Sequence, residues 1–244
     1  MIESFAARSR PSSVFTPLTF SSSSLSLFQV LPYAYVFGLY AVLGMLMDGV
    51  GSLLASLVGL ELSPHFDTPF LARSYGDLWA RRWNLVAGHS LRFLVFDVVA
   101  EGRLVKEPGA RPRRISLARR TVAVAACFVA SGLVHELEMF YVLPGLSSYT
   151  GCWMLFFSGW GAILALEKGL KMAAERASGS RLWREAKLPP LALPRWVATP
   201  LVVASSVAYA NLLFLPPAVD QGIAARVMKS ASWVLKVLLR LDLE

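Results

Sequence analysis

The chain has 244 residues, of which 55% are hydrophobic and 16% are charged, and its mean hydropathy is +0.53. Charged residues make up about a quarter of an average soluble domain, so this composition argues against a water-soluble enzyme and against a disordered chain. The formal net charge of +8 fits either a nucleic-acid partner or the cytosolic loops of a membrane protein.

Long apolar runs in the sequence predict membrane segments. Four runs stand out: Val30–Leu60, Thr121–Leu143, Gly151–Leu166 and Trp196–Pro217. A bilayer crossing takes about 20 residues, with a range of about 17 to 25. The first run is too long for one straight crossing, so it is either a steeply tilted helix or two short helices broken near Gly49 and Gly51. We expect an all-α, polytopic bundle of four to six membrane segments and no soluble domain.

The basic residues concentrate in two loops. Of the 24 Lys and Arg residues, seven lie in residues 103–120 and six in residues 168–187. These loops flank a hairpin made by the second and third apolar runs, so both face one compartment, which the positive-inside rule makes the cytosol. Aromatic residues do not interleave with the basic ones, so we expect no nucleic-acid partner. The loops could also bind an anionic cytosolic ligand.

The two ends of the chain are expected to lie outside a membrane-embedded domain of residues 30–217. Residues 1–29 are rich in serine and are interpreted as a segment that does not span, with a transit peptide as the alternative. Residues 218–244 predict an amphipathic helix in the interface, or a short span. Four basic residues share one stripe of that helix: Arg226, Lys229, Lys236 and Arg240.

His135 is the residue best placed for chemistry. It lies 14 residues into the run Thr121–Leu143, where an ionisable group is costly and by default faces the bundle interior. Helical periodicity puts Ser131 and Glu138 on the same face, and Gly132 leaves room one turn earlier. A neutral imidazole can take a proton from a hydroxyl, ligate a metal or relay protons. The alternative is a histidine that only packs and hydrogen-bonds.

The surroundings of His135 do not predict a metal site. No second His or Cys lies at ligand spacing, so carboxylates alone would have to complete the coordination. Glu136 either orients the imidazole, faces another helix, or lies near the membrane edge if the helix is offset. His65 and His89 lie in polar or mixed segments, and we expect both to be interfacial or structural.

A second polar segment follows the break at Pro69. Trp79 and Trp83 are one turn apart there, which predicts an amphipathic interfacial helix. One interpretation is an aromatic anchor at the lipid headgroups. The other is a cytosolic entrance lined by two guanidinium groups, with an amide reaching inward: Arg81, Arg82 and Asn84.

Two stretches of the sequence together resemble plant wax synthases, which are long-chain-alcohol O-fatty-acyltransferases of the membrane-bound O-acyltransferase superfamily. Leu78–Asn84 resembles their aromatic-Trp-Gly-Arg-Arg-Trp-Asn signature, with Leu78 and Ala80 as departures. Ser131–Leu137 resembles their Ser-Gly-x-x-His-Glu signature, in the family order. The resemblance covers roughly residues 30–217. Family members usually carry further membrane helices before this region, so the chain is expected to be N-terminally shortened.

The resemblance implies a multi-pass enzyme of the endoplasmic reticulum that transfers a fatty acyl group from acyl-CoA to a long-chain alcohol, forming a wax ester. It implies that His135 is the general base and that Asn84 hydrogen-bonds the reacting carbonyl or holds the donor. Five further residues are expected to contact substrate: Trp83, Arg81, Arg82, Glu136 and Ser131. Acyl-CoA is then a co-substrate, membrane lipids are partners, and no cofactor or metal is expected.

Other functions stay open at this point. A sterol or another lipid alcohol is the alternative acceptor. A catalytically inactive membrane scaffold and a proton-coupled carrier are alternatives of another class. A carrier predicts further charges within the membrane or paired broken helices. Asp48 and the Glu136/Glu138 pair are the intramembrane acids that would serve such a role.

Overall fold

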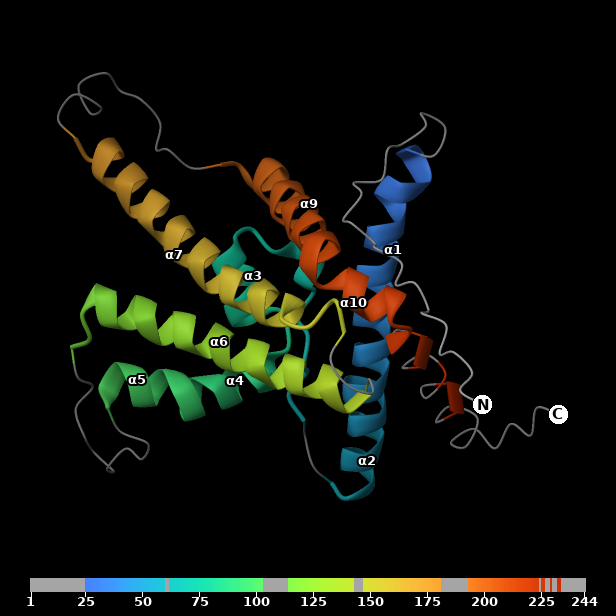
Figure 1. The fold of residues 1–244 in the computed structure, drawn as a ribbon. Helices are drawn as coiled ribbons and strands as arrows, with labels where there is room; N and C mark the ends of the chain where they lie inside the picture. The colour runs from blue at the N-terminus through green and yellow to red at the C-terminus, as the bar shows by residue number, and fades with distance from the viewer. Residues whose placement is uncertain are drawn as a thin grey trace, which may run out of the picture.

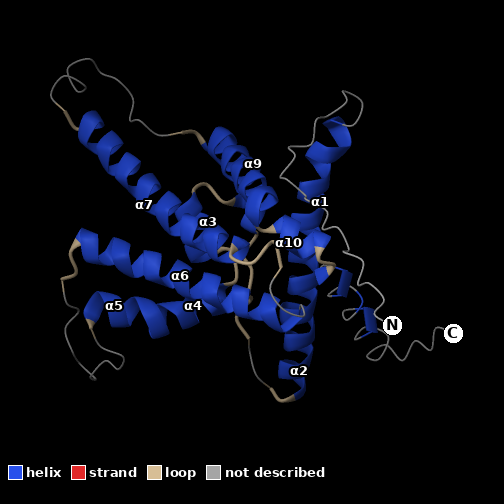
Figure 2. Cartoon of the chain, viewed as in Figure 1, coloured by secondary structure: helices blue, strands red, loops and turns tan. Residues whose placement is uncertain are grey.

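The computed structural model describes residues 25–59, 62–102, 114–142, 147–180 and 193–223, together with five residues of the C-terminal segment: Ala225, Arg226, Lys229, Ser232 and Trp233. These residues form helices joined by turns, with no strand among them (Figure 2). The predicted all-α class is therefore confirmed. Residues 1–24, residues 103–113 and 181–187 of the two basic loops, and most of the C-terminal amphipathic stretch lie outside the described residues.

The first apolar run forms one continuous helix (Figure 1). It comprises α1 (Leu25–Gly44), the π-helical turn η1 (Met45–Val50) and α2 (Gly51–Leu57). Gly44 and Gly51, at the two junctions, keep right-handed helical backbone angles. The prediction of two helices broken near Gly49 and Gly51 is thus wrong, because the π turn absorbs the irregularity without a break. The helix also begins five residues before the predicted boundary at residue 30.

The segment after Pro69 forms short helices. They are η2 (Pro69–Leu71), α3 (Tyr75–Arg81), α4 (Leu85–Leu91), η3 (Arg92–Phe96) and α5 (Asp97–Glu101). The last three run on as one helix beside α6 (Figure 1). The predicted amphipathic helix is shorter than expected. It ends at Arg81, where the Trp83 amide donates to the Leu78 carbonyl at 2.9 Å and Asn84 turns to a φ of 41°.

The predicted hairpin is present as α6 (Leu117–Val142) and α7 (Cys152–Ser178). A Cβ added to Gly132 would lie 3.1 Å from the Met154 Cα, and one added to Gly161 would lie 3.2 Å from the Ala125 Cα. Gly132 comes after Ala125 on α6, whereas its partner Met154 comes before Gly161 on α7. The two helices are therefore antiparallel. The start of α6 and the end of α7 therefore lie at the same end of the hairpin (Figure 1), together with the described parts of the two basic segments, residues 114–120 and 168–180.

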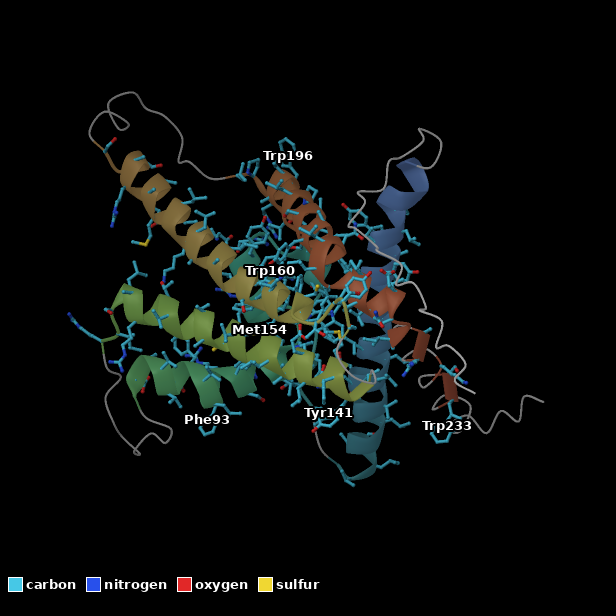
Figure 3. All side chains as sticks on the ribbon, in the orientation of Figure 1. Phe93, Tyr141, Met154, Trp160, Trp196 and Trp233 are labelled. Carbon is cyan, nitrogen blue, oxygen red and sulfur yellow. The ribbon has the colours of Figure 1, made fainter. Side chains whose placement is uncertain are left out.

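The core lies where α7 meets α3 and α9 (Arg195–Leu213), which continues into α10 (Leu215–Asp220). Trp160 is 2% exposed and lies at the centre of an aromatic cluster. Its ring centroid is 5.3 Å from Tyr75, 5.4 Å from Trp79 and 5.3 Å from Tyr209. Figure 3 shows Trp160 and Met154 in the middle of the helices, while four labelled side chains project from the periphery: Phe93, Tyr141, Trp196 and Trp233.

The exterior of the helices is apolar. Leu133, Leu137 and Phe140 of α6 are each more than half exposed, and Trp196 of α9 is 79% exposed. Such a surface is unfavourable in water and suits lipid, which also requires that spanning backbone be helical. Three helical stretches are long and apolar enough to cross a membrane: Val30–Leu57, Leu117–Val142 and Arg195–Leu213. Among the described residues, these three candidate spans are fewer than the four to six membrane segments expected. The helix α7 is not one of them.

Candidate functional site

His135 is held between two aromatic side chains of α7. Its ring centroid lies 4.1 Å from that of Phe157 and 6.1 Å from that of Trp153. Its Nδ1 lies 2.7 Å from the carbonyl oxygen of Ser131, one turn earlier on α6. Because a carbonyl oxygen only accepts hydrogen bonds, Nδ1 carries a proton, and in the neutral imidazole Nε2 then keeps its lone pair. The half-buried imidazole is therefore oriented as a base at Nε2.

Glu136 binds the neighbouring helix. Its Oε1 accepts a hydrogen bond from the Met154 amide at 3.0 Å, in the first turn of α7. Gly151, the N-cap residue of α7, offers no side-chain cap, so Glu136 supplies one from α6. Of the predicted alternatives, Glu136 takes the one that faces another helix. The His135 ring, which lies beside Trp153, is thus next to a helix start that α6 itself caps.

Gly132 sets the distance between the two helices of the hairpin. Replacing it with alanine would place a Cβ 3.1 Å from the Met154 Cα and 3.2 Å from the Met154 carbonyl oxygen, which are backbone atoms. Overpacking of this kind typically costs about 1–3 kcal/mol. We expect Gly132→Ala to lower the thermal midpoint of the detergent-solubilised protein, followed by fluorescence-detected size exclusion after heating.

Gly169→Ala is the matched control for that experiment, because Gly169 lies on α7 and its added Cβ meets nothing within 4 Å. Alanine is favoured over glycine in a helix by up to about 1 kcal/mol, so Gly169→Ala should be as stable as the parent chain or more stable. Equal midpoints for the two variants would show that the hairpin tolerates separation at Gly132.

Asn84 forms the N-cap of α4. Its backbone is left-handed, with φ 41° and ψ 65°, a conformation that asparagine tolerates better than most residues. Its Oδ1 accepts a hydrogen bond from the Ala87 amide at 3.2 Å. This bond uses the side-chain oxygen alone, so the amide NH₂ group takes no part in the cap.

The paired arginines have different surroundings. The Nε of Arg82 lies 2.9 Å from the Asp77 Oδ2, and its Nη1 donates to the Thr68 Oγ1 at 3.0 Å and to the Asp67 carbonyl at 3.2 Å. Arg82 therefore braces the segment itself. Arg81 is exposed at the end of α3. Of the two arginines predicted to line an entrance, Arg81 is the one with an exposed side chain.

Trp79 links the two signature stretches. Its ring centroid is 5.4 Å from Phe128 of α6 and 6.2 Å from Phe157 of α7, the residue that packs against His135. Its centroid also lies 6.4 Å from Trp83. The interpretation of Trp79 as a headgroup anchor is wrong, because its indole packs in the core and its Nε1 is buried.

Glu167 of α7 is a residue that sequence reasoning missed. Its Oε1 accepts from the Tyr75 amide at 3.2 Å, and its Oε2 accepts from the Gly76 amide at 2.9 Å. The Ser74 hydroxyl accepts from the third amide of α3, that of Asp77. The start of α3 is thus capped by its own serine and by α7. A signal was present in the sequence, since Glu167 is the first charge after the third apolar run.

The acids, histidines and cysteines of the described residues do not gather into a group of three or more that could hold a metal ion. Cys127 and Cys152 are half-buried and free.

In the link before α7, the hydrogen bond that Tyr149 donates to Asp220 raises the pKa of that phenol. This bond ties the link to α10.

Comparison with known proteins shows which family the chain resembles. A sequence model of the "Membrane bound O-acyl transferase family" matches residues 62–158, which contain both signature stretches. An Arabidopsis thaliana protein named "Probable long-chain-alcohol O-fatty-acyltransferase 8" is 36% identical over 137 residues, 56% of this chain and 38% of that protein. Over these residues the chain is similar to the wax synthase-like members of the membrane-bound O-acyltransferase family.

Further relatives show how much of the length of these acyltransferases the chain spans. Arabidopsis "Probable long-chain-alcohol O-fatty-acyltransferase 7" is 30% identical over 195 residues, 79% of this chain and 51% of that protein. "Acyl-CoA--sterol O-acyltransferase 1" from the same plant is 29% identical over 125 residues, 51% of this chain and 34% of that protein. The chain thus spans between about a third and a half of each of the three acyltransferases compared.

Proposed function

We propose that this chain is an acyl-CoA-dependent O-acyltransferase of the endoplasmic reticulum membrane that esterifies a long-chain alcohol to form a wax ester. The observation that carries the proposal is the state of His135, whose Nδ1 donates to the Ser131 carbonyl and whose Nε2 is left as a base. Similarity to this family supports acyl transfer, and the printed names of two relatives support a fatty alcohol as the acceptor.

The proposed reaction is a direct transfer. The Nε2 of His135 takes the hydroxyl proton of the alcohol as its oxygen attacks the thioester carbonyl carbon. The new carbon–oxygen bond forms, the carbon–sulfur bond breaks, and the imidazolium returns the proton to the CoA thiolate. The products are the ester and free CoA. The Asn84 amide is proposed to donate to the carbonyl oxygen as negative charge develops on it.

The surroundings of the site suit these substrates. Phe157 and Trp153 cover the imidazole with apolar surface, which limits water as a competing acceptor. Exposed Arg81 and the basic loops suit the anionic CoA portion. A sterol is the second candidate acceptor, favoured by the similarity to the sterol O-acyltransferase.

An assay with a panel of acceptors tests the proposal. Membranes of cells that express the chain would be incubated with labelled fatty acyl-CoA and, separately, a fatty alcohol, a sterol and a diacylglycerol. We expect labelled wax ester above the level of membranes without the chain. Sterol ester in its place would change the acceptor. The absence of ester with every acceptor would refute the enzyme and favour a scaffold or carrier.

A further inference from the structure

Asp48 is an acidic side chain in the π-helical turn η1 of a helix apolar enough to span a membrane. An ionisable group there is costly unless it is paired, and π turns occur frequently at functional sites. The Asp48 Oδ1 accepts two hydrogen bonds from His65, one from the backbone amide and one from the ring Nδ1, both at 2.7 Å. The carboxylate thus holds the loop after α2 against the long helix.

His65 carries this attachment to the start of α4. Its carbonyl oxygen accepts a hydrogen bond from the Leu85 amide at 2.8 Å, and Leu85 directly follows Asn84. Asn84 is in the left-handed region, so its neighbours must hold its backbone in place. His65 therefore connects Asp48 directly to Leu85, the residue that follows Asn84.

Two further contacts make the attachment of this loop specific. Phe66 is 8% exposed and packs edge-on against Trp83, with ring centroids 5.2 Å apart. The Asp67 amide donates to the Arg82 carbonyl at 2.9 Å. The loop 65–67 thus contacts Arg82, Trp83 and Leu85, the residues on either side of Asn84.

We infer that Asp48 is a positioning residue for Asn84, acting through His65 on the backbone of the signature turn. The inference rests on the proposed function, since Asn84 has a reaction to serve only if acyl transfer occurs. What the geometry requires of Asp48 is an oxygen that accepts hydrogen bonds. A proton-carrying role, as in a coupled carrier, would instead require its ionisable carboxylate.

A pair of substitutions separates these roles. Asp48→Asn keeps an accepting Oδ1 and removes the charge, whereas Asp48→Ala removes both. We expect Asp48→Ala to lower kcat roughly tenfold or more with an unchanged KM for acyl-CoA, since a misplacement of about 1 Å can cost about 10²-fold. Asp48→Asn should stay near the parent rate. Equal impairment of the two variants, or full activity of Asp48→Ala, would overturn the inference.

Two measurements keep the test decisive. If Asp48→Ala gives little folded protein, Asp48→Leu takes its place, because it keeps a side chain of similar shape and offers no acceptor, and a normal kcat in that variant would count against the inference. Hydrogen exchange of the peptide covering residues 62–90 needs no substrate and should be faster in Asp48→Ala than in Asp48→Asn. A parent chain that forms no ester would refute the proposed function, while the exchange comparison would still decide whether Asp48 holds the turn.

Discussion

Replacing His135 with alanine is expected to lower the rate of ester formation by about 10²–10⁴-fold, the usual contribution of a positioned general base. The reason is that Nε2 is the atom left to accept the alcohol proton once Nδ1 donates to the Ser131 carbonyl. The measurement is the initial rate with labelled acyl-CoA and a fatty alcohol, normalised to the amount of folded protein. Because the alanine leaves space beside Phe157, added imidazole should restore part of the rate.

His89→Ala is the control for this experiment, because His89 is exposed on α4 and the mechanism does not use it. It should keep the parent rate. A His135→Ala chain that keeps the parent rate would remove His135 from the mechanism. Loss of the folded protein in that variant would be answered by His135→Gln, which keeps a polar side chain of similar length but offers no basic nitrogen.

The sequence predicted the parts of the fold that depend on local pattern. The apolar runs and the basic loops beside them were enough to predict the α6–α7 hairpin. The depth of His135 in its run was enough to single it out. The sequence also indicated that Gly132 leaves room one turn before His135. In the structure Met154 of α7 lies against Gly132.

Contacts between distant residues were beyond the sequence. Glu167 caps a helix more than ninety positions earlier in the chain, and Asp48 binds His65 across seventeen positions. Periodicity gives the face on which a side chain lies but does not identify the helix that this face meets. Trp79 was misplaced for this reason, since an amphipathic pattern suits both a lipid interface and a partner helix rich in aromatic residues.

The π turns were also beyond the sequence. Residues 45–50 contain a glycine beside an acid, which favours a break when the sequence is considered alone. The surrounding apolar run keeps the backbone helical, because an interruption would expose unpaired amides and carbonyls to an apolar environment. The result is one extra residue in a turn and a continuous helix.

Asn84 carries the second large prediction, because its side chain has two roles that can be separated. Its Oδ1 caps α4, and its NH₂ group is the proposed donor to the reacting carbonyl. Asn84→Asp keeps the capping oxygen, for which aspartate and asparagine are about equal, and removes the donor. We expect a thermal midpoint close to that of the parent chain and a fall in kcat of about 10²–10³-fold, the cost of losing one donor to an oxyanion.

Asn84→Gly gives the complementary comparison. Glycine accepts the left-handed backbone and costs only a few tenths of a kcal/mol as an N-cap, so this variant should fold and be as slow as Asn84→Asp. Val86→Ala, at an exposed site two residues later on α4, should leave both the rate and the midpoint unchanged. If Asn84→Asp kept the parent rate while Asn84→Gly lost it, the oxygen alone would matter. Asn84 would then be a structural cap, and the donor to the carbonyl would have to be sought among the groups that surround His135.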